Sequence, residues 1–347
     1  MKKVRILSID GGGIKGILPG VVLDCLEIKL QQKSGNKDLR LSDIFDFFAG
    51  TSTGGILSIA LLIPDENGRP KFTAMDALNI YLDRGDEIFD VNLGRRLRSL
   101  GGTTDEKYSA KELEKALADK FGDLWFSELL KPCIISAYDI QHGTPFFFKQ
   151  HRASKNIFNF KVRDIARATS AAPTYFEPAR IRNELGSPYP LIDGGVFVNN
   201  PALAAYSEVR TMSFGDIINP GVEQMMIVSL GCGMRPKTYE YEKAKDWGAI
   251  GWVKPIIEIM MSGNAQTVDY HLQRMYETIQ ERADRDYYRL NPEIKTADPA
   301  MDNASPENMQ RLKEDALNYI SDGRVDDELN RIAERLLEQE DEAGSVH

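Results

Sequence analysis

The sequence predicts an α/β protein built on a mainly parallel, doubly wound β-sheet. Short apolar segments alternate along the chain with longer segments whose apolar residues recur at helical spacing. Several short segments end in glycine-rich turns, the place where functional residues gather in open α/β sheets. The chain has 347 residues, of which 42% are hydrophobic, so it can build a large core.

The N-terminal elements follow in order from this pattern. Val4–Ile9 is expected to be a strand, and residues 21–32 an amphipathic helix. Ile44–Ala49 is the second expected strand, and Gly55–Ile63 opens a buried helix. The remaining expected elements are helices at Met75–Phe89 and Ala110–Phe121, strands at Pro132–Tyr138 and Thr144–Lys149, a helix ended by Pro173, a strand, turn and helix over Tyr189–Val209, a late strand from Gln224, and a mostly helical C-terminal stretch.

Charge and cysteine content exclude several classes of protein. The net charge is −9 with no dominant basic stripe, so a nucleic-acid polymer is not an expected partner. Cys25, Cys133 and Cys232 are far apart and form no paired motif, which indicates neither disulfides nor a metal site and fits a reducing, cytoplasmic location.

The apolar run at the start is too short for a signal peptide, and no segment offers about 20 apolar residues for a membrane span.

Gly50–Gly54, with the sequence GTSTG, stands between the second strand and an apolar helix. Glycine-any-serine-any-glycine at such a junction is the pattern of a nucleophile elbow, in which Gly50 and Gly54 let backbone crowd the turn around Ser52. The pattern alone occurs by chance in roughly one chain in ten of this length, given a glycine content of about 7%. It therefore needs an oxyanion hole and a base to support it.

The first glycine loop, Gly11–Gly16, matches GxGxxG and allows three interpretations. A dinucleotide cradle requires an acidic residue at the end of the second strand, and Asp38 and Asp43 lie in a polar loop instead. A phosphate loop fails because no GK[ST] follows. The third interpretation, which Ser52 favours over a merely structural turn, is that the N–H groups of Gly12 and Gly13 stabilise an oxyanion.

The base of a serine hydrolase is usually histidine, and the four histidines here are poor candidates. His142, His151, His271 and His347 lie in polar, helical or terminal positions, and none follows a strand beside small residues. Asp193 differs, because it ends an apolar strand and is followed by Gly194 and Gly195. Asp10 also ends a strand, and its expected role is to shape the glycine loop.

Three motifs in this order resemble the patatin-like phospholipase family: DGGGIKG at 10–16, GTSTG at 50–54 and DGG at 193–195. The segments Ala168–Pro178 and 229–233 are also similar to it. The resemblance implies a three-layer α/β/α sandwich and lipid acyl-ester hydrolysis without metal or cofactor. It implies Ser52 as nucleophile, Asp193 as base, and Gly11, Gly12 and Gly13 as the oxyanion loop, with Asp10, Gly16, Gly50, Gly54, Gly194 and Gly195 as supporting motif residues. Lys15 stands where the family usually has arginine, and lysine lacks the planar fork.

The resemblance covers residues 4–235, which we expect to form the catalytic domain. We expect 236–340 to be a helical extension packed on the same domain and 341–347 to be a disordered tail. The expected partner is a lipid or membrane surface, contacted peripherally, and Arg95, Arg96 and Arg98 within Phe89–Gly102 are predicted to form a rim that contacts anionic headgroups.

Other functions stay open from the sequence. The same acyl-enzyme could pass its acyl group to an acceptor other than water, as an acyltransferase does. Some bacterial members of the family are effectors switched on by cyclic nucleotides, so a small-molecule activator is a further hypothesis. A nucleotide-binding oxidoreductase that uses the glycine loop is the alternative from another class.

Overall fold

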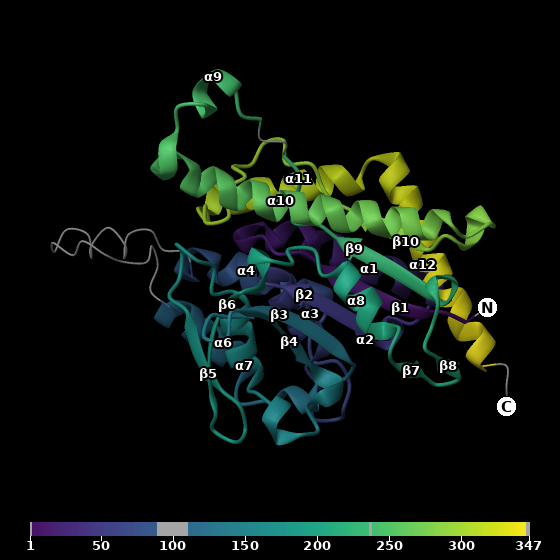
Figure 1. The fold of residues 1–347 in the computed structure, drawn as a ribbon. Coiled ribbons are helices and arrows are strands. Elements are labelled where there is room, and N and C mark those ends of the chain that lie inside the picture. Colours follow the sequence, from purple (N-terminus) through teal and green to yellow (C-terminus); the bar gives the residue numbers. More distant parts are fainter. Residues whose placement is uncertain (1, 89–109, 236–237, 345–347) are drawn as a thin grey trace.

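A computed structural model describes residues 2–88, 110–235 and 238–344 (Figure 1). Its central sheet has the order β10-β9-β1-β2-β3-β6-β5. β4 also belongs to this sheet and pairs with the other edge of β3. The strands are β1 (Val4–Ile9), β2 (Phe47–Thr51), β3 (Cys133–Asp139), β4 (Thr144–Lys149), β5 (Ala179–Arg182), β6 (Pro188–Asp193), β9 (Met225–Leu230) and β10 (Tyr287–Leu290), and β7 (Ser213–Phe214) pairs with β8 (Ile217–Ile218) in a separate two-stranded sheet.

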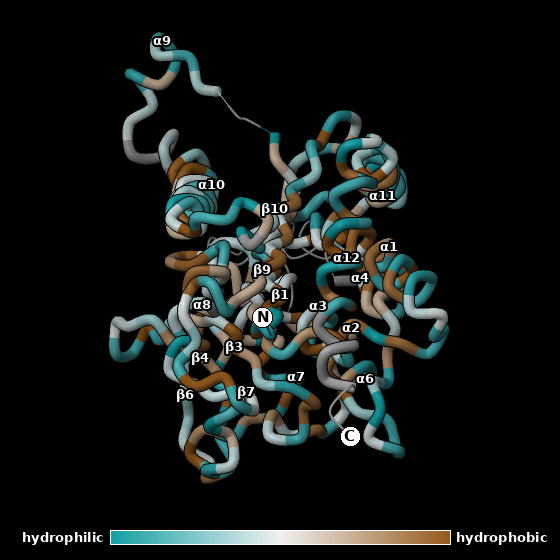
Figure 2. The backbone as a smooth tube through the Cα atoms, turned by 90° about the vertical axis from the view of Figure 1, so that its right-hand side faces the viewer, coloured by the Kyte–Doolittle hydropathy of each residue, from teal (hydrophilic) through white to brown (hydrophobic). Residues whose placement is uncertain are grey.

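Helices cover both faces of this sheet. The longer helices on one face are α1 (Ile17–Ser34), α3 (Thr53–Leu62), α4 (Ala74–Ile88), α6 (Ala110–Phe121), α7 (Val162–Thr169), α11 (Pro306–Ile320) and α12 (Gly323–Gly344). The other face carries α8 (Ala202–Val209) and α10 (Gly248–Glu277), while α2 (Leu41–Ile44) and α9 (Tyr241–Ala244) are single turns. Figure 2 shows α8 and α10 on one side of the strands and α1, α4 and α11 on the other.

The three layers follow from the alternation of side chains along each strand. In β1, Ile6 belongs to the core beneath α8 and α10, whereas Leu7 belongs to the core beneath α1 and α3. In β2, Phe47 and Phe48 divide between the two cores in the same way. Strands buried on both faces read as continuous apolar runs. The predicted three-layer sandwich is confirmed.

The sheet is mainly parallel, as predicted, with an antiparallel portion at one end. β10, β9, β1, β2 and β3 run parallel to one another. β4 and β6 are antiparallel to β3, and β5 is antiparallel to β6. The sequence analysis did not predict β5, although its four residues alternate between buried alanine or isoleucine and exposed arginine; four residues are a short stretch for this pattern.

The second strand begins three residues later than predicted. The expected strand was Ile44–Ala49, but Leu41–Ile44 is a helical turn and β2 spans Phe47–Thr51. The Asp43 carboxylate stabilises that turn by accepting a hydrogen bond of 2.9 Å from the Arg40 N–H. Apolar composition alone could not distinguish the buried turn from the buried strand.

The C-terminal stretch is mostly helical, yet it also supplies a strand of the central sheet. β10 pairs with β9 through register partners that include Tyr287↔Ile227 and Leu290↔Leu230. α12 extends to Gly344, so residues 341–344, which were expected to be disordered, continue a helix. The boundary at 235 stays a prediction. The predicted arginine rim within 89–102 lies outside the described residues.

Candidate active site

Ser52 lies at the sharp turn between β2 and α3. Its backbone has φ 53° and ψ −122°, a region that non-glycine residues rarely occupy, and the residue is only 7% exposed. A Cβ atom at Gly54 would lie 2.1 Å from the Ile9 carbonyl oxygen, so only glycine fits this close approach to β1. The elbow predicted from the sequence is therefore present in its geometry.

A threonine from another part of the chain supports the elbow. The Ser52 N–H donates to Thr169 Oγ1 at 2.9 Å, and Thr169 Oγ1 donates to the Ser136 carbonyl oxygen at 2.7 Å. The neighbouring Thr51 hydroxyl donates to the Val198 carbonyl oxygen at 2.7 Å. Sequence reasoning missed Thr169, although the segment around it was one of the family-like stretches. These bonds fix the strained turn against β3 and the chain that follows β6.

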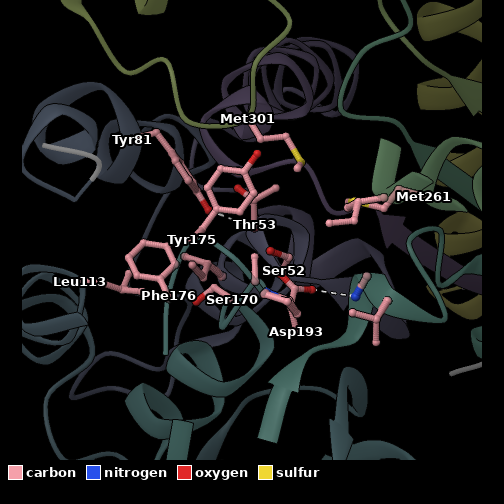
Figure 3. A pocket seen from close by; sticks show the side chains of 18 of the residues that line it. Ser52, Thr53, Tyr81, Leu113, Ser170, Tyr175, Phe176, Asp193, Met261 and Met301 are labelled. Carbon is pink, nitrogen blue, oxygen red and sulfur yellow. Dashed lines mark hydrogen bonds between the residues drawn. The ribbon is translucent and has the colours of Figure 1, made fainter. Parts of the chain in front are cut away.

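Asp193 lies beside Ser52 at the end of β6 (Figure 3). Its carboxylate accepts the Gly195 N–H at 2.7 Å, and the Ser52 side chain lies close enough to affect its pKa. The residue is 4% exposed. Burial raises the pKa of Asp193 to about 6, although the Ser52 side chain and the Gly195 N–H lower it. Such a carboxylate is ionised at neutral pH but is a stronger base than an ordinary aspartate.

The two residues converge for a reason that differs from the expected one. In a purely parallel sheet, both would stand at carboxyl ends on one edge. β6 is antiparallel, and its final residue pairs with Ala137 in the interior of β3. Thr51, the last residue of β2, pairs with Ser136, the preceding residue of β3. Because β4 pairs with these β3 residues along the other edge, β2 and β6 share one edge of β3. The C-terminal ends of the parallel β2 and the antiparallel β6 therefore meet on that edge, which brings Ser52 and Asp193 together.

The glycine loop faces the same pocket. The Gly11 N–H donates to the Asn199 carbonyl oxygen at 3.0 Å, so this donor is already used. Gly12 and Gly13 line the pocket, and no acceptor for their N–H groups is found in the described part of the chain. Gly13 has φ 61°, and a Cβ atom at Gly12 would lie 2.3 Å from the Cβ of Cys232. Two backbone donors thus remain available beside Ser52.

The charged residues of the loop have different surroundings. Asp10 is 2% exposed and forms a two-pronged ion pair with Arg289 of β10. Burial raises the pKa of Asp10, and the Arg289 guanidinium opposes that rise. Lys15 follows the donors in a 3-10 turn, where burial lowers the pKa of its ammonium group. Gly16 packs against Thr53 of α3.

None of the three described histidines lines the pocket. His142 bonds Asp139 at 2.7 Å, and His151 bonds Glu208 at 3.0 Å. His271 lies on α10, and His347 is outside the described residues. Among the described residues, the group next to Ser52 that can accept a proton is therefore the Asp193 carboxylate.

An apolar cavity of about 170 Å³ extends from Ser52 between the helices. Its polar end carries Ser52, Asp193, Gly12 and Gly13. The rest of the lining comes mainly from α3, α4, α6, the segment after α7, and α10: Thr53, Ile56, Ile80, Tyr81, Leu113, Ala116, Leu117, Ser170, Ala172, Pro173, Tyr175, Phe176, Gly195, Val196, Ile257, Met260, Met261 and Met301. Figure 3 shows Tyr81, Tyr175 and Phe176 across the cavity from Asp193. This lining fits an apolar group held against a few polar groups.

Residues 2–88, 110–235 and 238–344 contain neither a metal-binding cluster nor a membrane-spanning helix. Within these ranges, no group of three or more His, Cys, Asp or Glu side chains is arranged to hold a metal ion. No helix in the same ranges has both the length and the apolar character to cross a bilayer. A dinucleotide site requires an acidic residue at the end of the second strand. β2 ends at Thr51 and is followed by Ser52, so this position carries no acidic residue.

The fold and the cavity together define the class of the protein: an α/β protein in which a serine at a strained strand-to-helix turn lines an apolar cavity.

Comparison with known proteins identifies the family. The model of the patatin-like phospholipase family matches residues 7–206. Patatin-15 of Solanum tuberosum is 34% identical over 324 residues, which cover 89% of this chain and 81% of that protein. Patatin group M-2 of the same species is 33% identical over 326 residues, covering 90% and 82%. The crystal structure of VipD from Legionella pneumophila aligns with 92% of this chain and 67% of that chain, with a TM-score of 0.37 and 14% identity.

The chain belongs to the patatin-like phospholipase family, so the resemblance noted in the sequence is confirmed. Family membership supports lipid acyl hydrolase activity in the general sense.

Proposed function

We propose that this protein is a lipid acyl hydrolase of the phospholipase A or lysophospholipase type, acting through a Ser52–Asp193 dyad and an acyl-enzyme. The observation that carries the proposal is the close approach of a strained serine to a buried aspartate of raised pKa at the polar end of an apolar cavity. Perturbed carboxylates in such clefts are typical of catalytic bases.

The reaction follows from the placement of these groups. Ser52 Oγ attacks the ester carbonyl carbon while Asp193 takes the hydroxyl proton. The Gly12 and Gly13 N–H groups donate to the resulting oxyanion. Asp193 then gives the proton to the leaving alcohol, and the acyl group stays on Ser52. In the second half of the reaction, water attacks the carbonyl carbon of the acyl-enzyme while Asp193 takes a proton from the water. Asp193 then returns this proton to Ser52 Oγ, and the fatty acid leaves. Gly11 is not a donor in this scheme, because its N–H is bound to Asn199.

The cavity lining supports an acyl chain as the group that is recognised. Ile56, Leu113 and Leu117 form an apolar wall leading away from Ser52, so a hydrocarbon chain would exchange water for aliphatic contacts. Each methylene buried in this way stabilises the bound state by about 0.8 kcal/mol. Since the polar groups gather at one end, the ester carbonyl is expected to lie at Ser52 and the chain to extend inward.

The surface near the cavity supports peripheral contact with a lipid surface. Met260 of α10 lines the cavity and is itself 55% exposed. Trp252, Ile256 and Ile259 on the same helix are also exposed. A lipid molecule could pass from a bilayer to Ser52 along these apolar side chains without full hydration of its chain.

The proposal is tested by incubating the protein with mixed phospholipid vesicles and measuring released fatty acids by mass spectrometry. The expected result is fatty acid release by the wild type and none by Ser52→Ala. A fluorophosphonate probe should label the wild type at Ser52. Ser58→Ala is the matched control, because Ser58 is buried in α3, the helix that follows Ser52, and does not line the cavity, so labelling should stay intact. Release that persists in Ser52→Ala would refute the dyad.

The same assay addresses the acyltransferase alternative. Transfer to an added alcohol or lysolipid, with little free fatty acid, would assign the acyl-enzyme to synthesis rather than hydrolysis. Addition of cyclic nucleotides tests the hypothesis of a small-molecule activator, which predicts release only in their presence.

A further inference from the structure

Arg289, in the C-terminal part of the chain, binds Asp10, the residue before the glycine loop. It lies on β10, 279 residues after Asp10 and outside the segment matched by the family model. Its Nη1 donates to Asp10 Oδ1 at 2.9 Å and its Nη2 to Asp10 Oδ2 at 2.5 Å. Two parallel charge-assisted bonds fix both the distance and the plane of the carboxylate.

The strand register explains how Arg289 reaches this loop. Arg289 pairs with Ser229 of β9, and Ser229 pairs with Ser8 of β1. Side chains paired in this way share one face of the sheet, and Asp10 follows Ser8 by two residues. The guanidinium crosses β9, where Nη1 also donates to Ser229 Oγ at 2.9 Å, and ends at Asp10. Tyr287, two residues before Arg289, donates to Asp269 of α10 at 2.8 Å and so braces β10 on the same face.

Asp10 is the fixed point from which the glycine loop begins. Its N–H donates to the Leu230 carbonyl oxygen at 2.9 Å, and its carbonyl oxygen accepts from Cys232 Sγ at 3.1 Å. Two residues later, Gly12 lies so close to Cys232 that a Cβ atom would not fit. A small movement of Asp10 therefore changes where the Gly12 N–H points.

We infer that Arg289 is a positioning residue for the oxyanion donors, acting through the Asp10 carboxylate. Arginine is suited to this task because its rigid fork matches both carboxylate oxygens and keeps its charge when buried. Without it, a carboxylate that is 2% exposed would lose its counter-charge. A buried charge without a partner is strongly unfavourable. Asp10 would therefore either move toward solvent, and the start of the glycine loop with it, or take up a proton. The helical C-terminal part of the chain thus takes part in catalysis through one side chain.

The chain contains a matched control. Arg335 forms a similar two-pronged pair with Asp286, through Nε at 3.2 Å and Nη2 at 2.7 Å. Asp286 also accepts from Lys3 at 2.8 Å, and none of these three residues lines the cavity. Arg335→Gln therefore removes a C-terminal arginine–aspartate pair without disturbing the oxyanion donors.

The test compares Arg289→Gln with Arg335→Gln on a soluble ester. We expect Arg289→Gln to lower kcat by about 100-fold, the effect of a displacement of about 1 Å at a catalytic group, and to leave KM within about twofold because the cavity is unchanged. The rate of Ser52 labelling by a fluorophosphonate should fall with kcat. Arg335→Gln should lower the melting temperature but keep both rates. Arg289→Lys, which keeps the charge and loses the fork, is the second variant if Arg289→Gln does not fold, and it should lose part of kcat.

Because this role depends on the proposed use of Gly12 and Gly13 as donors, the wild type decides the first question. A wild type that neither hydrolyses esters nor reacts with the probe overturns the proposed function, and the role of Arg289 falls with it. An active wild type, together with folded Arg289 variants that react at the wild-type rate, overturns the positioning role alone. Equal losses of kcat in Arg289→Gln and Arg335→Gln would also overturn it, because the effect would then be general destabilisation.

Discussion

Replacing Asp193 with asparagine is expected to abolish hydrolysis and at the same time stabilise the fold at neutral pH. The pKa of this carboxyl is raised from 3.8 to about 6 by burial. The folded protein therefore holds the proton more tightly than the unfolded chain does. Folding stability falls as pH rises from about 4 to about 6, and the full penalty is present at pH 7.

The size of the penalty follows from the same values. A rise from 3.8 to about 6 corresponds to about 3 kcal/mol, at about 1.4 kcal/mol for each tenfold change in proton affinity. Asparagine has nearly the same shape, keeps an oxygen that can accept the Gly195 N–H, and carries no charge. For a chain of 347 residues, about 3 kcal/mol corresponds to a rise of about 4 °C in the melting temperature.

Thermal unfolding of the wild type and Asp193→Asn at about pH 7 and about pH 4 measures this effect. The variant should melt higher at the neutral pH, and most of the difference should vanish at the acidic pH. Asp315→Asn provides a control of opposite sign. Burial raises the pKa of Asp315, but hydrogen bonds from Ala297, Thr296 and Lys295 outweigh burial and hold it below its ordinary value. Asp315→Asn should therefore lose stability at neutral pH, and less as the pH falls. A variant at Asp193 that melts at or below the wild-type temperature at about pH 7 would refute the reasoning.

Further outcomes can be checked on the same protein. For hydrolysis, kcat/KM should rise about tenfold between pH 5 and pH 7 with a midpoint of about 6, and the midpoint should persist when His142, His151, His271 and His347 are all replaced. A midpoint that vanishes with a histidine would assign the base elsewhere. Gly12→Val should lose roughly 100- to 1000-fold in kcat, since its side chain meets Cys232, whereas Lys15→Ala should keep substantial activity. Equal tolerance of both changes would contradict the oxyanion role. Ala116→Phe should fill the cavity and lower kcat/KM for long-chain esters by roughly tenfold or more, with short-chain esters little affected; a uniform loss would show that the chain binds elsewhere.

Local sequence was sufficient to predict the central parts of the site. Ser52 and the glycine loop could be found because a tight strand-to-helix turn needs small residues at fixed spacing, and Asp193 because a carboxylate ended an apolar strand. Thr169, Asn199 and Arg289 could not be found in this way. Each acts through a bond to a distant segment, and strand order and register decide those bonds. The antiparallel direction of β6 was missed for the same reason, because a single strand has the same pattern in either direction.

The pairing of β6 also determines where the chain can change in length. Adding or deleting one residue within Pro188–Asp193 would turn every later side chain of the strand to the opposite face, carrying the carboxylate away from Ser52. The tip of the preceding hairpin turn has no such constraint, since Leu185 is 63% exposed and Gly186 adopts φ 82° in the open. We therefore expect insertions to be tolerated at the tip of this turn but not within β6, because the length of β6 determines where the Asp193 carboxylate lies relative to Ser52.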